Sequence, residues 1–154
     1  MSFDNPKGTR GSRQPRASLA MQWFNNWAIS RIRRSGKFMG GMDALVLTTV
    51  GRKTGAQRRT PVGYFPGGND SWLVVASAAG AVRNPAWYYN IAAHPDEVRI
   101  EVAGRKVAVT AEQLSGTTRE DAWRQITAAS PRFARYRQKT DRLLPVIRLV
   151  PRVG

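Results

Sequence analysis

The hydrophobic residues of this chain recur with two different periods. Near the N-terminus the period is helical, and Trp27 and Ile32 belong to an apolar set spaced by three or four residues. This spacing predicts a helix over residues 18–34, followed by Gly36, a residue type that commonly ends helices. We expect the N-terminal amphipathic segment as a whole to span residues 18–40.

After residue 44 the period shortens and β-branched residues become frequent. Short or alternating apolar runs bounded by Gly, Pro and Asn predict six strands. They cover residues 45–50, 60–65, 72–77, 97–103, 106–110 and 144–150. Because Gly104 stands between the fourth and fifth runs, these two are expected to form a hairpin.

Three more helices are expected among and after the strands. The first has Asn84 as N-cap and Pro85 at its first position and ends near His94. The second covers residues 119–129, with Thr117 or Thr118 as its cap and Glu120 and Asp121 in its first turn, and a further helical turn runs from Pro131 to Lys139. Together these elements predict one α+β, mainly β domain: a small antiparallel barrel over residues 41–154, preceded by a disordered basic arm over residues 1–17.

Composition and charge narrow the class of protein. A chain of 154 residues with 42% hydrophobic and 23% charged residues is typical of a globular domain. The absence of cysteine and the single histidine, His94, exclude disulfides, thiol catalysis and a multi-histidine metal site, so we expect no metal. No apolar run reaches the ~20 residues of a membrane helix and no secretory signal is evident, which favours a cytoplasmic protein. The net charge of +15 gathers at both ends of the chain and favours an anionic partner.

Four cations lie close together in the turn predicted after residue 50. They are Arg52, Lys53, Arg58 and Arg59, and Gly51 and Gly55 punctuate the same stretch. The spacing is neither that of a Walker A loop nor that of a dinucleotide-binding fingerprint. Backbone amides and charge-assisted hydrogen bonds suit such a loop to an anion such as phosphate. The alternative interpretation is a solvated hairpin turn.

A second segment offers surfaces suited to a flat ring. The strand at residues 74–78 ends in small side chains, against which a ring can lie. The helix that follows begins with Trp87 and Tyr88, an aromatic wall, and carries the amide of Asn90 one turn further on. The alternative is that the two aromatic residues belong to the hydrophobic core.

Read together, the two segments form a specific order. It runs LTTVGRKTG at residues 47–55, Arg58, Pro61, Ala-Ser at 76–77 and NPAWYYN at 84–90, with TDR at 140–142. This order resembles the deazaflavin-dependent nitroreductase family of actinobacteria, split β-barrel proteins that use the reduced coenzyme F-420 to reduce quinones and, in some members, nitro compounds. The resemblance implies an FMN-binding-like split β-barrel of about six antiparallel strands with peripheral helices, and an oxidoreductase that uses F-420.

The resemblance also implies the residues of the site. Arg52, Lys53 and Arg58 would hold the coenzyme's phosphate and the start of its acidic glutamyl tail, next to Thr54. The backbone of two strands would line the deazaflavin: Arg59, Thr60, Pro61, Val62 and Gly63 on one, and Val75, Ala76, Ser77 and Ala78 on the other. The following helix would close the opposite side, with Ala86, Trp87, Tyr88, Tyr89 and Asn90. Tyr136 would cap the pocket and touch the acceptor. With the hydride supplied by the coenzyme, Ser77, Tyr136 or water would provide the proton or hydrogen bond to the product oxygen.

Two departures from the family pattern bear on nitro compounds as acceptors. The chain has Ala78-Ala79 where a lysine is common, and Phe133 together with Tyr136 where tyrosines are common.

Several alternatives stay open from the sequence. An FMN enzyme on the same barrel is one, and a non-enzymatic basic barrel that binds nucleic acid through Tyr64, Trp72 and Trp87 is another. No nucleic acid is expected on the leading interpretation, and the oligomeric state does not follow from the sequence. The helix at residues 19–34 either packs on the domain or lies on anionic lipid at the inner face of the plasma membrane, with its tryptophans at the interface.

Overall fold

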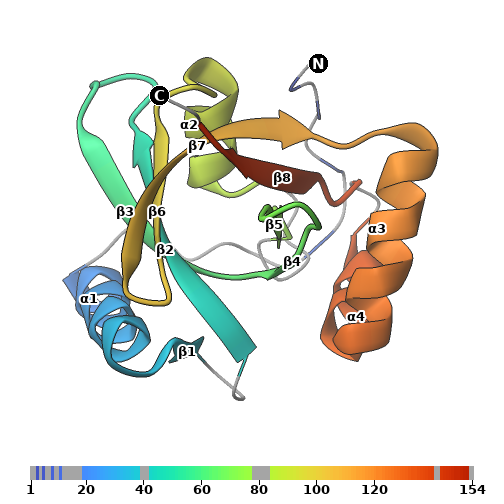
Figure 1. Ribbon diagram of the computed structural model, residues 1–154, viewed down its shortest axis with the longest axis horizontal. Helices are drawn as coiled ribbons and strands as arrows, with labels where there is room; N and C mark the ends of the chain where they lie inside the picture. The colour runs from blue at the N-terminus through green and yellow to red at the C-terminus, as the bar shows by residue number, and fades with distance from the viewer. Residues whose placement is uncertain are drawn as a thin grey trace.

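One antiparallel sheet of eight strands curls into a half-barrel, and four helices surround it (Figure 1). The computed structural model describes residues 3, 5, 8, 11, 19–38, 42–77, 84–140 and 143–152. The strands follow the order β1-β2-β6-β7-β8-β5-β4, and β3 pairs with β2 outside this path. Among the described residues β3 pairs with β2 alone, so it forms an edge of the sheet there.

The elements have the following bounds. The strands are β1 (Lys37–Phe38), β2 (Met42–Val50), β3 (Gln57–Gly63), β4 (Phe65–Pro66), β5 (Trp72–Val75), β6 (Val98–Val102), β7 (Arg105–Gln113) and β8 (Val146–Pro151). The helices are α1 (Leu19–Ser35), α2 (Ala86–Ala93), α3 (Gly116–Ala129) and α4 (Pro131–Lys139).

All six predicted strands are confirmed, with ends that shift by up to three residues. The two extra strands, β1 and β4, have two residues each and carry no periodic pattern of their own. The predicted hairpin is confirmed as well, because Val102 pairs with Arg105 across a two-residue turn. Both turn residues, Ala103 and Gly104, have positive φ angles of 51° and 76°, as a type I′ turn requires.

The helices are confirmed, but two predicted caps are wrong. Pro85 rather than Asn84 is the N-cap of α2, since the Asn84 side chain is engaged with Asn5. The N-cap of α3 is Ser115, upstream of the threonines, so the two predicted acidic residues lie beyond the first turn. The turn predicted after residue 130 is the nine-residue helix α4.

The two faces of the sheet pack against different helices. The inner face, which holds Leu45 and Leu47 of β2, packs against α2 and forms the largest core cluster. The outer face holds Ala44 and Val46, and Ile32 of α1 packs against them. β2 is therefore buried on both faces, which explains why its sequence is apolar throughout rather than alternating.

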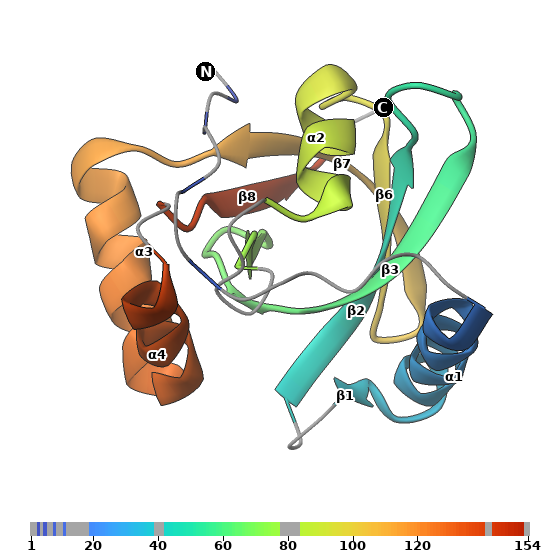
Figure 2. The same cartoon turned by 180° about the vertical axis from the view of Figure 1, so that it is seen from behind.

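The third and fourth helices form a separate layer at the other end of the sheet. Their buried side chains, among them Trp123 and Phe133, pack on β4, β5 and β8. Figures 1 and 2 show α1 and the α3–α4 pair on opposite sides of the molecule.

Most of the basic arm predicted over residues 1–17 lies outside the described residues, and so does Ser18, the first residue of the predicted helix. Two of its residues contact the fold. The ring of Phe3 lies edge-on to Tyr88 at 6.0 Å, and the buried Asn5 exchanges hydrogen bonds of 2.8 Å with Asn84. The predicted boundaries of the arm and the barrel stay a prediction.

Candidate active site

A pocket of about 990 Å³ opens where the loop between β2 and β3 meets α1 and α2. Gln22, Asn25, Asn26, Ile29, Ser30, Arg33, Gly51, Arg52, Lys53, Thr54, Gln57, Arg58, Arg59, Thr60, Ala86, Trp87 and Asn90 line it. The lining is thus one basic loop, the edge strand β3, the start of α2 and one face of α1. The pocket joins the basic loop to the start of α2, whereas the strand end at residues 74–77 does not line it.

The loop that forms the floor of this pocket is tightly closed on itself. The N–H of Gly51 donates to the carbonyl of Ala56 at 2.7 Å, and the N–H of Gly55 donates to the carbonyl of Gly51 at 2.8 Å. A Cβ at residue 51 would lie 2.9 Å from Oγ1 of Thr54, and Gly55 has a φ of +73°. Both positions therefore favour glycine. The closure holds the intervening basic residues on a fixed turn.

The four cations of this region are exposed and have no acidic partner. Among the residues that the structure describes, no carboxylate lies within 4.0 Å of Arg52, Lys53, Arg58 or Arg59. Because side chains alternate along a strand, Arg58 belongs to the inner face of β3 and Arg59 to its outer face. The cluster therefore offers positive charge on both sides of the sheet edge, which fits an extended polyanion better than a single small anion.

Asn90 connects α2 to this loop. Its side-chain oxygen accepts the backbone N–H of Arg52 at 3.1 Å, and its amide donates to Oγ1 of the buried Thr49 at 3.2 Å. Asn90 itself is buried, so both ends of its amide are used inside the protein. Its observed role is to position the loop, whereas the sequence predicted a direct contact with the ring.

Aromatic residues of α2 take three different roles. Trp87 is buried but lines the pocket, as predicted. The Tyr89 ring lies 4.8 Å from the guanidinium carbon of Arg52, a cation–π contact that orients this side chain. Tyr88 is 1% exposed and its hydroxyl donates to Gln113 in the core at 2.6 Å, which supports the alternative that it is a core residue; its contact with the coenzyme stays a prediction.

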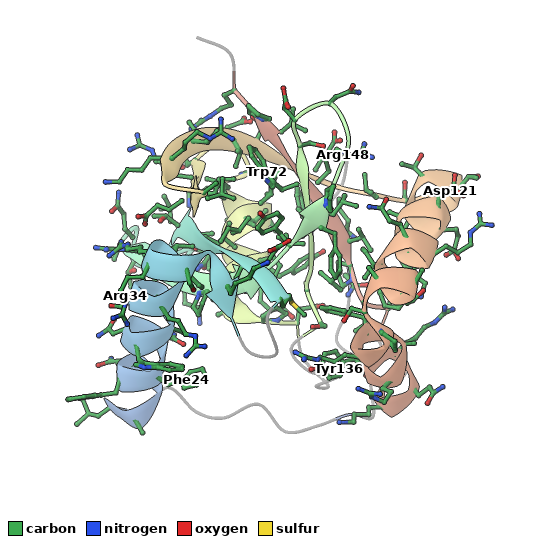
Figure 3. All side chains as sticks on the ribbon, turned by 60° about the horizontal axis from the view of Figure 1, so that its bottom comes forward. Phe24, Arg34, Trp72, Asp121, Tyr136 and Arg148 are labelled. Atoms are coloured by element: carbon green, nitrogen blue, oxygen red, sulfur yellow. The ribbon has the colours of Figure 1, made fainter. Side chains whose placement is uncertain are left out.

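The structure does not bring Tyr136 to this pocket. Its ring packs 5.6 Å from Phe133 on α4, against the core cluster of the other layer. Figure 3 shows Tyr136 and Phe24 on helices at opposite sides of the molecule. The predicted role of Tyr136 beside the acceptor stays a prediction, since this tyrosine belongs to a helix that does not line the pocket described here.

The remaining predicted residues fall into two groups. Pro61, Val62, Gly63, Val75, Ala76 and Ser77 lie in or at the ends of strands and do not line the pocket, while Ala78 lies outside the described residues. Ser77 is buried, and its predicted role beside the ring stays a prediction.

The wall contributed by α1 was not predicted. Its polar side chains Gln22, Asn25, Asn26 and Ser30 line the pocket together with Ile29, and the recurrence of amides at helical spacing was the signal that could have found them. The last member, Arg33, forms a bidentate ion pair with Glu101 of β6 at 3.0 and 3.1 Å. The hydrogen bond from Arg33, its charge, and the charges of Lys106 and Arg59 hold the pKa of Glu101 below its usual range, against the opposing effect of burial.

Two further properties of the described residues bear on the function. They contain no group of three or more His, Cys, Asp or Glu side chains placed to hold a metal ion. None of the helices in this part of the chain is long and apolar enough to cross a membrane.

Comparison with known proteins identifies the family to which this chain belongs. A family model described as F420H(2)-dependent quinone reductase matches residues 25–151. An F420H(2)-dependent quinone reductase of Mycobacterium tuberculosis is 35% identical over 116 residues, which cover 73% of this chain and 76% of the relative. A solved F420-H2 dependent reductase, FDR-A, superimposes with a TM-score of 0.62 at 34% identity, over 69% of this chain and 92% of that one. A solved domain-swapped dimer gives a TM-score of 0.63 at 31% identity, over 84% and 98%.

These similarities establish that the protein is a split half-barrel reductase of the deazaflavin type. The chain belongs to the F420H(2)-dependent quinone reductase family. The predicted fold, enzyme class and coenzyme are thereby confirmed, and the alternatives of an FMN enzyme and of a nucleic-acid-binding barrel are set aside.

Proposed function

We propose that the pocket between α1, the 51–59 loop and α2 is the coenzyme site of this reductase, and that a quinone accepts the hydride. The observation that carries this proposal is the set of cations on a closed loop, without a carboxylate partner among the described residues, next to Trp87 and Asn90, in a chain of this family. The coenzyme fits, because its phosphodiester and carboxylates match exposed guanidinium and ammonium groups that have no acidic partner.

The coenzyme supplies the hydride, so the residues of the chain act by binding and orientation. Arg52, Lys53 and Arg58 bind the phosphate, and each charge-assisted hydrogen bond contributes about 1.5–3 kcal/mol. Asn90 and Tyr89 position Arg52 for this contact. The closed loop keeps the cations in place before binding, which lowers the cost of ordering them when the coenzyme arrives.

The roles of Ser77 and Tyr136 beside the acceptor rest on the resemblance alone. Reduction of nitro compounds likewise stays a prediction from the resemblance, and we propose a quinone as the acceptor.

The coenzyme proposal is tested by titration with F-420 and with FMN, followed by tryptophan fluorescence. Combining Lys53→Ala with Arg58→Ala is expected to lower the affinity for F-420 by about tenfold or more, since two charge-assisted contacts are lost. The matched control combines Arg105→Ala with Arg124→Ala, which removes the same charge at exposed positions outside the pocket. Equal affinities of the two double variants would contradict the proposal, and so would tight binding of FMN without a response to F-420.

We further propose that α1 rests on an anionic membrane surface, where lipid-soluble quinones reside. Its apolar residues divide into two sets: Ile29 and Ile32 are buried against the sheet, whereas Leu19, Trp23 and Trp27 are 77%, 79% and 49% exposed. Large apolar side chains of this exposure on one helix are unusual for a protein surface. The arginines in the last turn of α1, Arg33 and Arg34, add positive charge beside them.

The membrane contact is tested with vesicles of phosphatidylglycerol and of phosphatidylcholine. Leu19→Ser combined with Trp23→Ser is expected to abolish binding to the anionic vesicles while leaving coenzyme affinity unchanged, because neither residue lines the pocket. Leu143→Ser is the matched control, since Leu143 is an exposed leucine 49% accessible outside α1. Binding that survives in the double variant would place the contact elsewhere.

A further inference from the structure

Asn5 joins three segments of the fold, although it lies upstream of residues 25–151, which the family model matches. Its side-chain amide donates to Oδ1 of Asn84 at 2.8 Å and to the carbonyl of Leu143 at 3.0 Å. The amide of Asn84 donates back to the backbone carbonyl of Asn5 at 2.8 Å. The start of the chain is thereby tied to the residue before the N-cap of α2 and to the segment that leads into β8.

The amide pair of Asn5 and Asn84 is shielded from water. Only 8% of Asn5 and 2% of Asn84 is exposed. Hydrogen bonds between buried amides hold their partners firmly, because a group that loses such a bond cannot regain it from solvent without a change in the packing. The pair therefore fixes the position of Asn84 relative to the N-terminal segment.

The start of α2 depends on this contact. Its N-cap residue, Pro85, makes no side-chain hydrogen bond, and the side chain of the preceding Asn84 is engaged with Asn5 instead. A helix of eight residues is not stable by itself, so tertiary contacts decide where it begins. Phe3 supplies a second such contact, with its ring edge-on to Tyr88 at 6.0 Å. Both residues of the N-terminal segment thus act on α2.

The same end of α2 carries part of the proposed coenzyme pocket. Ala86, Trp87 and Asn90 line the pocket, and Asn90 accepts the backbone N–H of Arg52 at 3.1 Å. A displacement of the helix start would move Trp87 and the Asn90 amide together. Asn5 is therefore linked to the basic loop by way of Asn84 and α2.

We propose that Asn5 is a positioning residue for the coenzyme site: its amide pair with Asn84 holds the start of α2, and with it Trp87 and Asn90, in the geometry that binds the coenzyme. This inference rests on the proposed function, since it needs the coenzyme in that pocket. Asn5 itself does not line the pocket. It acts by keeping the site ordered before the coenzyme arrives, which lowers the cost of binding.

The affinity for F-420 is measured by tryptophan fluorescence in the full chain that carries Asn5→Leu, a change that keeps the size of the side chain and removes the amide. We expect Kd to rise about three- to tenfold, within the range found for residues that act on a ligand at a distance. Asn5→Ala should give a loss in the same direction. Ile126→Val is the matched control, because it lowers stability by trimming a buried side chain of α3 and should leave Kd unchanged.

A double-mutant cycle shows whether Asn5 acts through Asn84. The variant that combines Asn5→Ala with Asn84→Ala should bind F-420 as tightly as Asn84→Ala alone, because both changes remove the same pair of hydrogen bonds. Losses that add in the double variant would overturn the inference, since the two side chains would then act independently.

Amide hydrogen exchange of the protein without coenzyme gives a readout that does not depend on the proposed function. The N–H of Arg52 is protected by its bond to Asn90, so it should exchange faster in the Asn5→Leu protein, together with the amides of α2. The amides of the β6–β7 hairpin should exchange as in the wild-type protein, because the described hydrogen bonds of Asn5 do not reach this hairpin.

The outcomes separate the two proposals. Equal affinity of the wild-type and Asn5→Leu proteins for F-420 would overturn the role of Asn5 and leave the coenzyme pocket intact. A loss of affinity without faster exchange in α2 and at Arg52 would also overturn it, because the helix start would then not have moved. Failure of the wild-type protein to bind F-420 would overturn the proposed function itself, and faster exchange at Arg52 would still support the link from Asn5 to the loop.

Discussion

The side-chain oxygen of Asn90 accepts the backbone N–H of Arg52 at 3.1 Å and so fixes the start of the basic loop to α2. The same side chain donates to Thr49 at the end of β2. We expect Asn90→Ala to lower the stability by about 1–3 kcal/mol, because buried partners lose their hydrogen bonds. The affinity for F-420 should fall as well, since the loop is then no longer held before binding.

Denaturant unfolding and coenzyme titration check this expectation. Thr49→Val serves as the control, because it removes the contact with Thr49 and keeps the one with Arg52. It should reduce stability with little effect on coenzyme affinity. If both variants lowered affinity equally, the hydrogen bond to Arg52 would not be what positions the loop.

The contact between Tyr89 and Arg52 predicts a smaller loss of coenzyme affinity than the loss expected for the Asn90 variant. Replacing Tyr89 by Leu keeps an apolar side chain beside the guanidinium and removes the ring face that lies 4.8 Å from its carbon. At an exposed site such a contact contributes about 0.5–1 kcal/mol, which corresponds to a two- to fivefold loss of coenzyme affinity. Tyr89→Phe should retain most of the affinity. A full loss in the phenylalanine variant would assign the effect to the hydroxyl group, which accepts a hydrogen bond from Asn84.

For Tyr88 we expect a loss of stability without a loss of coenzyme affinity, because the structure places this residue in the core. Tyr88→Phe removes the 2.6 Å hydrogen bond to Gln113 and leaves a buried amide oxygen without this partner. The stability is expected to fall by about 1–3 kcal/mol while the affinity for F-420 stays unchanged. Thermal unfolding and titration of the same samples measure the two quantities. A loss of affinity at unchanged stability would instead indicate that Tyr88 contacts the coenzyme.

The ion pair of Arg33 with Glu101 predicts a pH dependence of stability. Since the pKa of Glu101 is lowered in the folded protein, the pair stabilises the fold above the ordinary carboxyl pKa, and this contribution is lost as the pH falls through the lowered value. Glu101→Gln should therefore reduce the melting temperature at pH 7 by a small amount, as partly exposed pairs contribute about 0–1 kcal/mol. The difference from the wild-type protein should shrink in acid. A difference that is constant with pH would exclude the ion pair as its cause.

The sequence predicted the helices and the six main strands because their patterns are local. Periodicity sufficed for α1 and β6, and the type I′ hairpin followed from the glycine after Ala103. The caps were less predictable, since the choice between Asn84 and Pro85 depended on a contact with Asn5, far away in the chain. The two-residue strands β1 and β4 are too short to show a period.

The site was predictable as far as its residues lie close together in the chain. The loop from Arg52 to Arg59 and the start of α2 were found, because each forms a short motif. The wall of α1 was missed, since the packing of Ile32 on β2 is a tertiary contact that no local pattern records. The packing of Tyr136 could not be predicted for the same reason, as nothing in its helix indicates which side of the sheet that helix covers.

The most direct test of the account is a single-turnover experiment with reduced F-420 and a water-soluble quinone. Mixed with the wild-type protein, the reduced coenzyme is expected to be oxidised as the quinone is consumed, in equal amounts, at a rate that saturates with coenzyme. The variant that combines Lys53→Ala with Arg58→Ala should require about tenfold more coenzyme for half its maximal rate, because binding and not hydride transfer is impaired. Oxidation that is absent with F-420, or that proceeds equally well in this variant at low coenzyme concentration, would contradict the central claim.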